Sequence, residues 1–278
     1  MQKSELSTIS PKNGRGFKDL EALCIFVGYP RSGHSLISSL LDAHPNIIIA
    51  QRPDALKYIK HGFSMQQICY LLLEDSKGSA RNGRGTWLFK QPRRLNPVPI
   101  SKYSYEVPNQ WQGKCQELRV IGYSAVGTST QRFRKHPELL QRLRRAFELK
   151  MRFVHVVRNP YDNISTISRR KERNLEESIQ IYFSFCETIE SLKKQIAADE
   201  LFELNHELFL QDPQAILKEL CHFLNESASD DYLRDCARIV HKSPHQSRHD
   251  AQWDHRLINI VRDRIAEFDF LKGYCFDN

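Results

Sequence analysis

The stretch most able to do chemistry is residues 28–35, which read GYPRSGHS. A glycine, four residues, a second glycine and then a hydroxyl residue at position 35 make the spacing of a phosphate-binding loop. Loops that hold nucleoside triphosphates carry a lysine where this chain has His34. The spacing therefore predicts an anion site without the usual cation, and Arg31, inside the loop, is the residue that would supply the charge.

A strand and a helix must position this loop. Residues 22–28, ALCIFVG, form an apolar run typical of a buried strand, and Ser35 begins a segment with apolar residues at positions 36, 37, 40 and 41, which predicts a helix. In such a unit the loop amides and the helix N-terminus converge on one point, where an anion is stabilised. The alternative is a turn that only joins a strand to a helix.

A second cation is expected beside this loop. The predicted strand 152–157 ends in VVRNPYDN, with Arg158 at its tip. A triphosphate site would need a carboxylate there to hold Mg²⁺ through water. An arginine at that place argues for a second anionic group, so the ligand predicted is a nucleoside with a phosphate-like group at each end and no metal.

The remaining sequence alternates strand patterns with helix patterns, which predicts an α/β fold with three α/β/α layers around a central parallel sheet, of the P-loop nucleotide-binding type. The predicted strands are 22–28, 46–50, 118–122, 152–157 and 201–204. The predicted helices are 35–42, 53–60, 65–74, 137–150, 161–169, 175–198, 213–224, 230–240 and 257–270. We expect a flexible tail over 1–17 and a single domain over 18–278. Residues 76–117 interrupt the alternation and predict a long substrate-side insertion.

The composition restricts the classes of partner that we expect this protein to bind. Forty-one Lys and Arg against 33 Asp and Glu give a net charge of +8, which favours anionic ligands. The seven cysteines are scattered without a Cys-x-x-Cys pair, which favours a reducing, cytoplasmic location over a zinc site or a disulfide framework. No apolar run is long enough to predict membrane insertion, and no basic and aromatic groove predicts a nucleic-acid partner.

Two segments together resemble a known family. FVGYPRSGHSLISSLLDAHP and FVHVVRNPYDNISTISRR look like the cofactor motifs of the sulfotransferases that use 3′-phosphoadenosine 5′-phosphosulfate (PAPS), of the P-loop-containing bacterial and tyrosylprotein type. A third segment, LFELNHELFLQDPQAILKELCHFLN, resembles the strand and helix that follow these motifs in the family. The motifs run in the family's order from residue 26 to about residue 274, so the resemblance covers nearly the whole domain.

The resemblance implies a role for particular residues. The first motif would cradle the 5′-phosphosulfate of PAPS, or the 5′-phosphate of the product 3′-phosphoadenosine 5′-phosphate (PAP). Arg158 and Thr166, eight residues apart, would clasp the 3′-phosphate, and Arg248 would belong to a C-terminal segment that covers the cofactor. The loop residues expected in the cofactor site are Arg31, Ser32, Gly33, His34 and Ser35. Arg31 and His34 are also expected to act in transfer, and His34 as an imidazolium would add charge.

The general base departs from the family's pattern. The family places a Glu, or a His-Glu pair, after the strand that follows His-Pro, whereas this chain has Gln51 and Arg52 there. Neither side chain accepts a proton near neutral pH. Asp54 is the nearest carboxylate and is the catalytic candidate, with an acidic residue favoured at a helix start as the alternative, and Lys90 is a further candidate. The prediction is therefore a PAPS-dependent sulfotransferase that modifies a hydroxyl or amine; the alternatives are a non-catalytic protein that binds PAP or PAPS, and a P-loop kinase.

The acceptor is predicted only by class, as a small molecule, a glycan or a peptide. Residues 131–152 carry eight Lys or Arg against two Glu, which favours an acidic acceptor, or simply an amphipathic surface helix with a solvated basic face. Tyr103, Tyr105 and Trp111 form an aromatic loop that could stack on a sugar or pack over the sheet edge.

Overall fold

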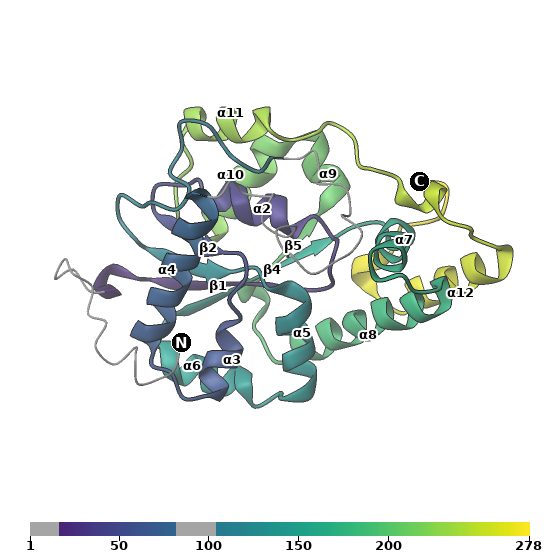
Figure 1. The fold of residues 1–278 in the computed structure, drawn as a ribbon, viewed down its shortest axis with the longest axis horizontal. Coiled ribbons are helices and arrows are strands. Elements are labelled where there is room, and N and C mark those ends of the chain that lie inside the picture. Colours follow the sequence, from purple (N-terminus) through teal and green to yellow (C-terminus); the bar gives the residue numbers. More distant parts are fainter. Residues whose placement is uncertain (1–16, 82–103) are drawn as a thin grey trace, which may run out of the picture.

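A five-stranded sheet forms the centre of the protein (Figure 1). The computed structural model describes residues 17–81 and 104–278. The strands are β1 (Ala22–Val27), β2 (Ile47–Ala50), β3 (Val120–Tyr123), β4 (Lys150–Val157) and β5 (Leu201–Asn205). They lie in the order β2-β3-β1-β4-β5, and every neighbouring pair is parallel. The five predicted strands are confirmed, each to within two residues at either end.

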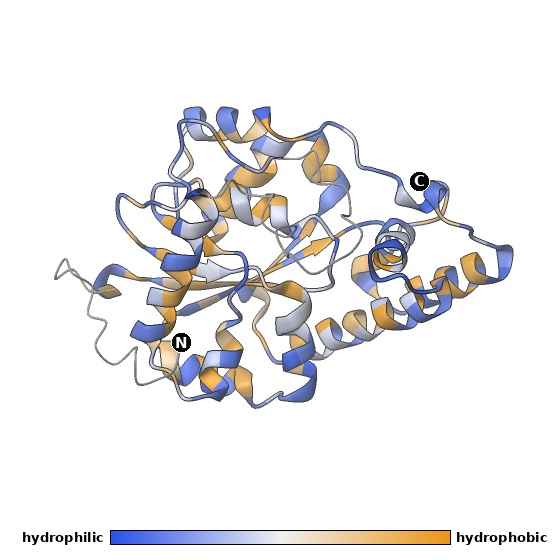
Figure 2. Ribbon diagram, viewed as in Figure 1, coloured by the Kyte–Doolittle hydropathy of each residue, from blue (hydrophilic) through white to orange (hydrophobic). Residues whose placement is uncertain are grey.

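Helices cover both faces of this sheet because alternate residues of each strand point to opposite sides. In β1, Ala22, Cys24 and Phe26 pack in one core and Leu23, Ile25 and Val27 in another. The first core is covered by α2 (His34–Leu41), α9 (His206–Gln211), α10 (Pro213–Phe223) and α11 (Asp230–Arg238). The second is covered by α3 (Ala55–Lys60), α4 (Met65–Arg81), α5 (Val126–Lys135) and α6 (Leu139–Phe147). The α/β/α layers are therefore as predicted, and Figure 2 shows the hydrophobic residues on the strands and along one stripe of several helices.

A third hydrophobic core lies beyond the carboxyl end of β4, where it includes Val157. It joins α7 (Pro160–Lys171), α8 (Leu175–Lys193) and α12 (His255–Ile265) through apolar side chains such as Ile164, Phe183 and Val261. Four 3₁₀ turns complete the described chain: Phe17–Asp19, Ala198–Glu200, Ser247–Asp250 and Asp269–Leu271. This third core places the segment around Ser247 against α7, far from it in sequence, and so builds one wall of the site described below.

Most predicted helices are confirmed, and the differences have physical causes. Helix α5 escaped prediction because its sequence, VGTSTQRFRK, begins with residues that favour turns and strands. Helix α9 has only six residues, too few for a periodic pattern. The predicted helix 137–150 ends at Phe147, where Glu148 adopts a left-handed conformation with a φ of 49°. The amphipathic reading of this segment is confirmed, because Leu139, Leu140, Leu143 and Phe147 are buried.

The predicted insertion is described only in part. Helix α4 runs on to Arg81, past the point where we expected irregular chain, and residues 82–103, which include Tyr103 and Lys90, lie outside the described residues. Residues 104–117 pack back onto the domain, since the amide of Trp111 donates to the carbonyl of Ala43 and the Gln112 side chain donates to that of Ser39. The predicted tail 1–17 also falls outside the described residues, except for Phe17. Within the described part, none of the helices has the length and apolar character needed to cross a bilayer.

Candidate functional site

The glycine-rich loop follows β1, the central strand, at the carboxyl edge of the sheet. Strand β1 pairs with β3 on one side and β4 on the other, and ligands of open α/β sheets bind at such a place, where the strand order reverses. Three loop residues have positive φ: Gly28 at 120°, Arg31 at 74° and Gly33 at 95°. Gly33 then caps α2, so the unpaired amides of its first turn, which holds His34 and Ser35, face the loop. The strand, loop and helix predicted from the sequence are confirmed.

Arg31 of this loop interacts with residues from two other segments of the chain. The side chain of Arg31 is half-buried, and its pKa is lowered by burial and by the nearby charge of Arg170 at the end of α7. Tyr105, from the predicted insertion, has the opposite effect and raises the pKa of Arg31. Tyr105 therefore lies close enough to the phosphate loop to act on the charge of Arg31, and the substrate-side role of this segment stays a prediction.

His34 does not supply a positive charge to the site. Burial and the neighbouring Arg31 lower its pKa to about 4, so the imidazole is neutral near pH 7. Its Nδ1 lies 3.3 Å from the hydroxyl of Ser32, a buried residue of the same loop. The lowered pKa favours the hydrogen-bonding role predicted for His34 over the imidazolium role, and both stay predictions.

Arg158 lies at the tip of β4, buried to 8% exposure, and is tied to the loop. Its Nη1 donates to the carbonyl of Arg31 over 3.2 Å, its Nη2 donates to the carbonyl of His245, and its Nε has no partner among the described residues. The nearest carboxylates are engaged elsewhere: Asp162 pairs with Arg248, and Glu207 accepts from the Asn159 amide and the Tyr274 hydroxyl. Burial accordingly lowers the pKa of Arg158. The site holds a buried cation whose charge no direct ion pair with a described residue offsets.

Thr166 sits beside Arg158 in a cluster that the sequence did not reveal. Its hydroxyl donates to the carbonyl of Asp162 over 2.8 Å and lies 3.0 Å from the hydroxyl of Ser247. Ser247 in turn lies 2.9 Å from Nδ1 of His245, the residue whose carbonyl receives Arg158. His245 and Ser247 are thus added to the predicted pair Arg158 and Thr166. No local sequence motif identifies His245 and Ser247, because the residues that they contact lie after β4 and on α7.

Arg248 is built into the fold rather than held out to a ligand. Its side chain is 1% exposed and pairs with Asp162 on α7 at 2.7 Å, while its Nη2 donates to the carbonyl of Asn278 over 2.6 Å. A buried ion pair of this kind joins the C-terminal segment to α7. These contacts give Arg248 the position of a residue that supports the wall behind Arg158 and Thr166, and its direct contact with the cofactor stays a prediction.

The position after β2 holds no base. The Gln51 side chain donates to the hydroxyl of Ser39 over 2.8 Å, and Arg52 pairs with Asp75 on α4 at 2.7 Å. Asp75 also accepts from both backbone amides of this turn. Gln51 and Arg52 therefore fasten the turn to α2 and α4, and the other candidate, Lys90, lies outside the described residues.

Asp54 is likewise engaged in structure. Its carboxylate caps α3 by accepting from the Leu56 amide, pairs with Arg132 on α5 at 2.6 Å and accepts from the Ser129 hydroxyl at 3.2 Å. The residue is 6% exposed. All of these contacts lie in the layer of α3 and α5, on the face opposite α2. The geometry thus favours the helix-start role of Asp54, and its catalytic role stays a prediction.

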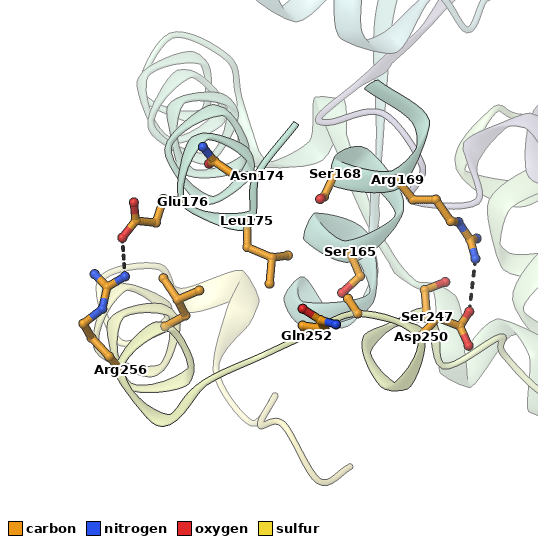
Figure 3. Close-up of a pocket in the computed structure, with 12 residues that line it drawn as sticks. Ser165, Ser168, Arg169, Asn174, Leu175, Glu176, Ser247, Asp250, Gln252 and Arg256 are labelled. Atoms are coloured by element: carbon orange, nitrogen blue, oxygen red, sulfur yellow. Dashed lines mark hydrogen bonds and ion pairs between the residues drawn. The ribbon is translucent and has the colours of Figure 1, made fainter. Parts of the chain in front are cut away.

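A pocket of about 540 Å³ lies next to the Arg158 cluster (Figure 3). It shares Ser247 with that cluster and is flanked by two ion pairs, Arg169 with Asp250 and Arg256 with Glu176. None of the loop residues 28–35 lines it. The pocket therefore neighbours the anion site without coinciding with it. Over residues 17–81 and 104–278, no group of His, Cys, Asp and Glu has the arrangement of a metal site.

The sequence and the fold are both similar to those of known proteins. The family model described as "Sulfotransferase family" matches residues 24–230. The fold is similar to the sulfotransferase domain of the Synechococcus PCC 7002 olefin synthase, at 17% identity over 88% of each chain with a TM-score of 0.50. It is also similar to the sulfotransferase domain from the curacin biosynthetic pathway, at 16% identity over 89% of this chain and 97% of the other, with a TM-score of 0.55. A comparison with curated proteins found no match.

Proposed function

This chain belongs to the sulfotransferase family, and we propose that it moves a sulfuryl group from PAPS to a hydroxyl or amine of its acceptor. The proposal assigns the 5′-phosphosulfate to the loop 28–35 and the 3′-phosphate to Arg158 and Thr166. PAP would remain after transfer. The free state of all seven cysteines supports the proposal of a reducing, cytoplasmic location.

Arg158 is the observation that carries the proposal. A guanidinium buried at the sheet edge without a direct ion pair to any residue of 17–81 or 104–278 is costly, and the cost falls when an anion binds to it. Its Nη1 bond to Arg31 puts this second cation next to the phosphate loop. Two separate anion sites joined by one hydrogen bond fit a nucleotide with phosphates on both its 3′ and 5′ positions better than a triphosphate chain.

The chain's own residues fit the demands of sulfuryl transfer. When bound, PAPS supplies an activated sulfuryl group with a nucleotide phosphate as its leaving group. Negative charge develops on that phosphate, and the α2 amides together with Arg31 are placed to stabilise it. Preorganised donors of this kind contribute on the order of 10²–10³ in rate each. The neutral His34 adds hydrogen bonding without adding a third cation to the site.

The proposed acceptor is a small molecule, a glycan or a peptide, and one of acidic character suits the basic surface. Arg142 and Arg145 of α6 are exposed, whereas Arg144 is neutralised by two hydrogen bonds to Glu200. The solvated basic face predicted from the sequence is therefore partly paired within the protein.

Calorimetric titration tests the proposed donor. The full chain is titrated with PAP, with 5′-AMP and with Mg·ATP at one ionic strength. We expect PAP to bind more tightly than 5′-AMP by about tenfold or more, since a charged hydrogen bond contributes about 1.5–3 kcal/mol. A preference for Mg·ATP, or equal affinities for PAP and 5′-AMP, would contradict the proposal.

A further inference from the structure

His206 packs against the phosphate loop from a distant part of the chain. It is the first residue of α9, directly after β5, and so lies at the same edge of the sheet as the loop. A Cβ atom added to Gly33 would lie 2.2 Å from Cδ2 and 2.6 Å from Nε2 of this ring. The edge of the imidazole that carries Nε2 therefore faces Gly33, the residue at which α2 begins.

The two ring nitrogens of His206 have different surroundings. The residue is 8% exposed, and Nδ1 is buried with no hydrogen-bond partner among the described residues. In a neutral imidazole one nitrogen carries the proton, and the hydrogen bond made by the other decides which. No described acceptor holds a proton on Nδ1, so we assign it to Nε2, the nitrogen that faces the loop.

The charge state of the ring agrees with a role as a neutral donor. Burial, and then the positive charge of Arg158, lower the pKa of His206 to about 3. The site already contains the cations of Arg31 and Arg158, and a third buried charge would repel both. A neutral N–H stabilises a bound anion without this repulsion in the free protein.

We propose that His206 is a donor-binding residue whose Nε2–H donates a hydrogen bond to the 5′-phosphate of the nucleotide held over Gly33. The inference rests on the proposed function, and it adds a contact from β5 and α9 to a site otherwise built by β1 and β4. Since Nε2 carries the proton, His206 is not the base that deprotonates the acceptor. The contact also requires glycine at position 33, because a side chain there would occupy the place of the ring.

Two amide substitutions separate the ring nitrogens. The amide of glutamine reaches the position of Nε2, whereas that of asparagine reaches only the position of Nδ1. We expect His206→Asn to weaken both PAP and 5′-AMP by about tenfold or more, and His206→Gln to stay within about threefold of the parent. Affinity for 3′-AMP, which has no 5′-phosphate, should be the same in all three proteins. Calorimetric titration gives these affinities, and thermal unfolding without ligand shows that the variants are folded.

Each outcome bears on a different claim. If the parent binds PAP and His206→Asn binds it equally well, the role of His206 is wrong while the proposed function stands. If asparagine preserves affinity and glutamine does not, the assignment of the proton to Nε2 is overturned. If the substitutions weaken 3′-AMP as much as 5′-AMP, the ring does not act on the 5′-phosphate. If the parent fails to bind PAP at all, the proposed function falls, and this inference with it.

Discussion

The guanidinium of Arg158 donates from Nη1 to the main-chain carbonyl of Arg31 over 3.2 Å, which ties the tip of β4 to the middle of the phosphate loop. Arg31 has a φ of 74°, so its carbonyl is turned by an unusual backbone conformation. The two proposed phosphate subsites are therefore parts of one hydrogen-bonded unit. Changes at either residue should act on both the shape of the loop and the charge of the site.

Replacing Arg158 should affect the 3′-phosphate above all. We expect Arg158→Ala to weaken PAP by about 10- to 100-fold, because a charged hydrogen bond is lost, and 5′-AMP by no more than about threefold. Calorimetric titration measures both affinities. Arg145→Ala removes the same charge from the exposed face of α6 and is the matched control. Equal losses for the two nucleotides would remove Arg158 from the 3′-phosphate site.

Replacing Asp54 should affect stability and leave nucleotide binding unchanged. Asp54→Asn keeps the cap on α3 but leaves Arg132 without its carboxylate, which should lower the free energy of unfolding by about 3 kcal/mol. Urea unfolding measures this loss. The double variant with Arg132→Met should recover part of it, since the uncompensated charge is then removed. A fall in turnover without a fall in stability would restore Asp54 as the catalytic base.

Gly33→Ala should destabilise the folded protein for two separable reasons. The new Cβ would lie 2.2 Å from the His206 ring, and the φ of 95° is strained for any residue with a side chain. Adding His206→Ala removes the collision and leaves the strain. Thermal unfolding should therefore show partial recovery in the double variant, and full recovery would mean that the backbone conformation contributes nothing.

Acid should destabilise the protein through two histidines that are neutral in the folded state, the half-buried His34 and the buried His206. The pKa values of His34 and His206 are lowered to about 4 and about 3, against about 6.5 in an unfolded chain. Between these values the unfolded chain binds more protons than the folded one, so stability is complete above about pH 6.5 and decreases as the pH falls toward 4. Each histidine contributes up to about 1.4 kcal/mol per pH unit in this window.

The slope of stability against pH tests this directly. Urea unfolding between pH 4 and 7 should give a shallower slope for His206→Gln than for the parent, because one of the two protons is no longer taken up on unfolding. His222→Gln changes an exposed histidine and should leave the slope unchanged. A parent protein whose stability does not vary across this range would contradict the neutral state of both rings.

Local patterns in the sequence were enough to predict the architecture, the phosphate loop and Arg158. Apolar runs and helix spacing identify all five strands, because burial on both faces of a parallel sheet leaves a continuous apolar signature. Glycine spacing identifies the loop, and Arg158 is readable because it directly follows a strand. Each of these signals lies within a few neighbouring residues, so each can be read without knowing what packs against it.

Only the tertiary structure decided what the isolated polar residues do. Asp54 meets Arg132 across 78 positions and Arg248 meets Asp162 across 86, so their ion pairs leave no trace in local spacing. His206 reaches Gly33 only because β5 and β1 end at the same edge of the sheet, with β4 between them. Burial then sets the charge of the histidines, since the desolvation that lowers a pKa depends on every segment packed around the ring.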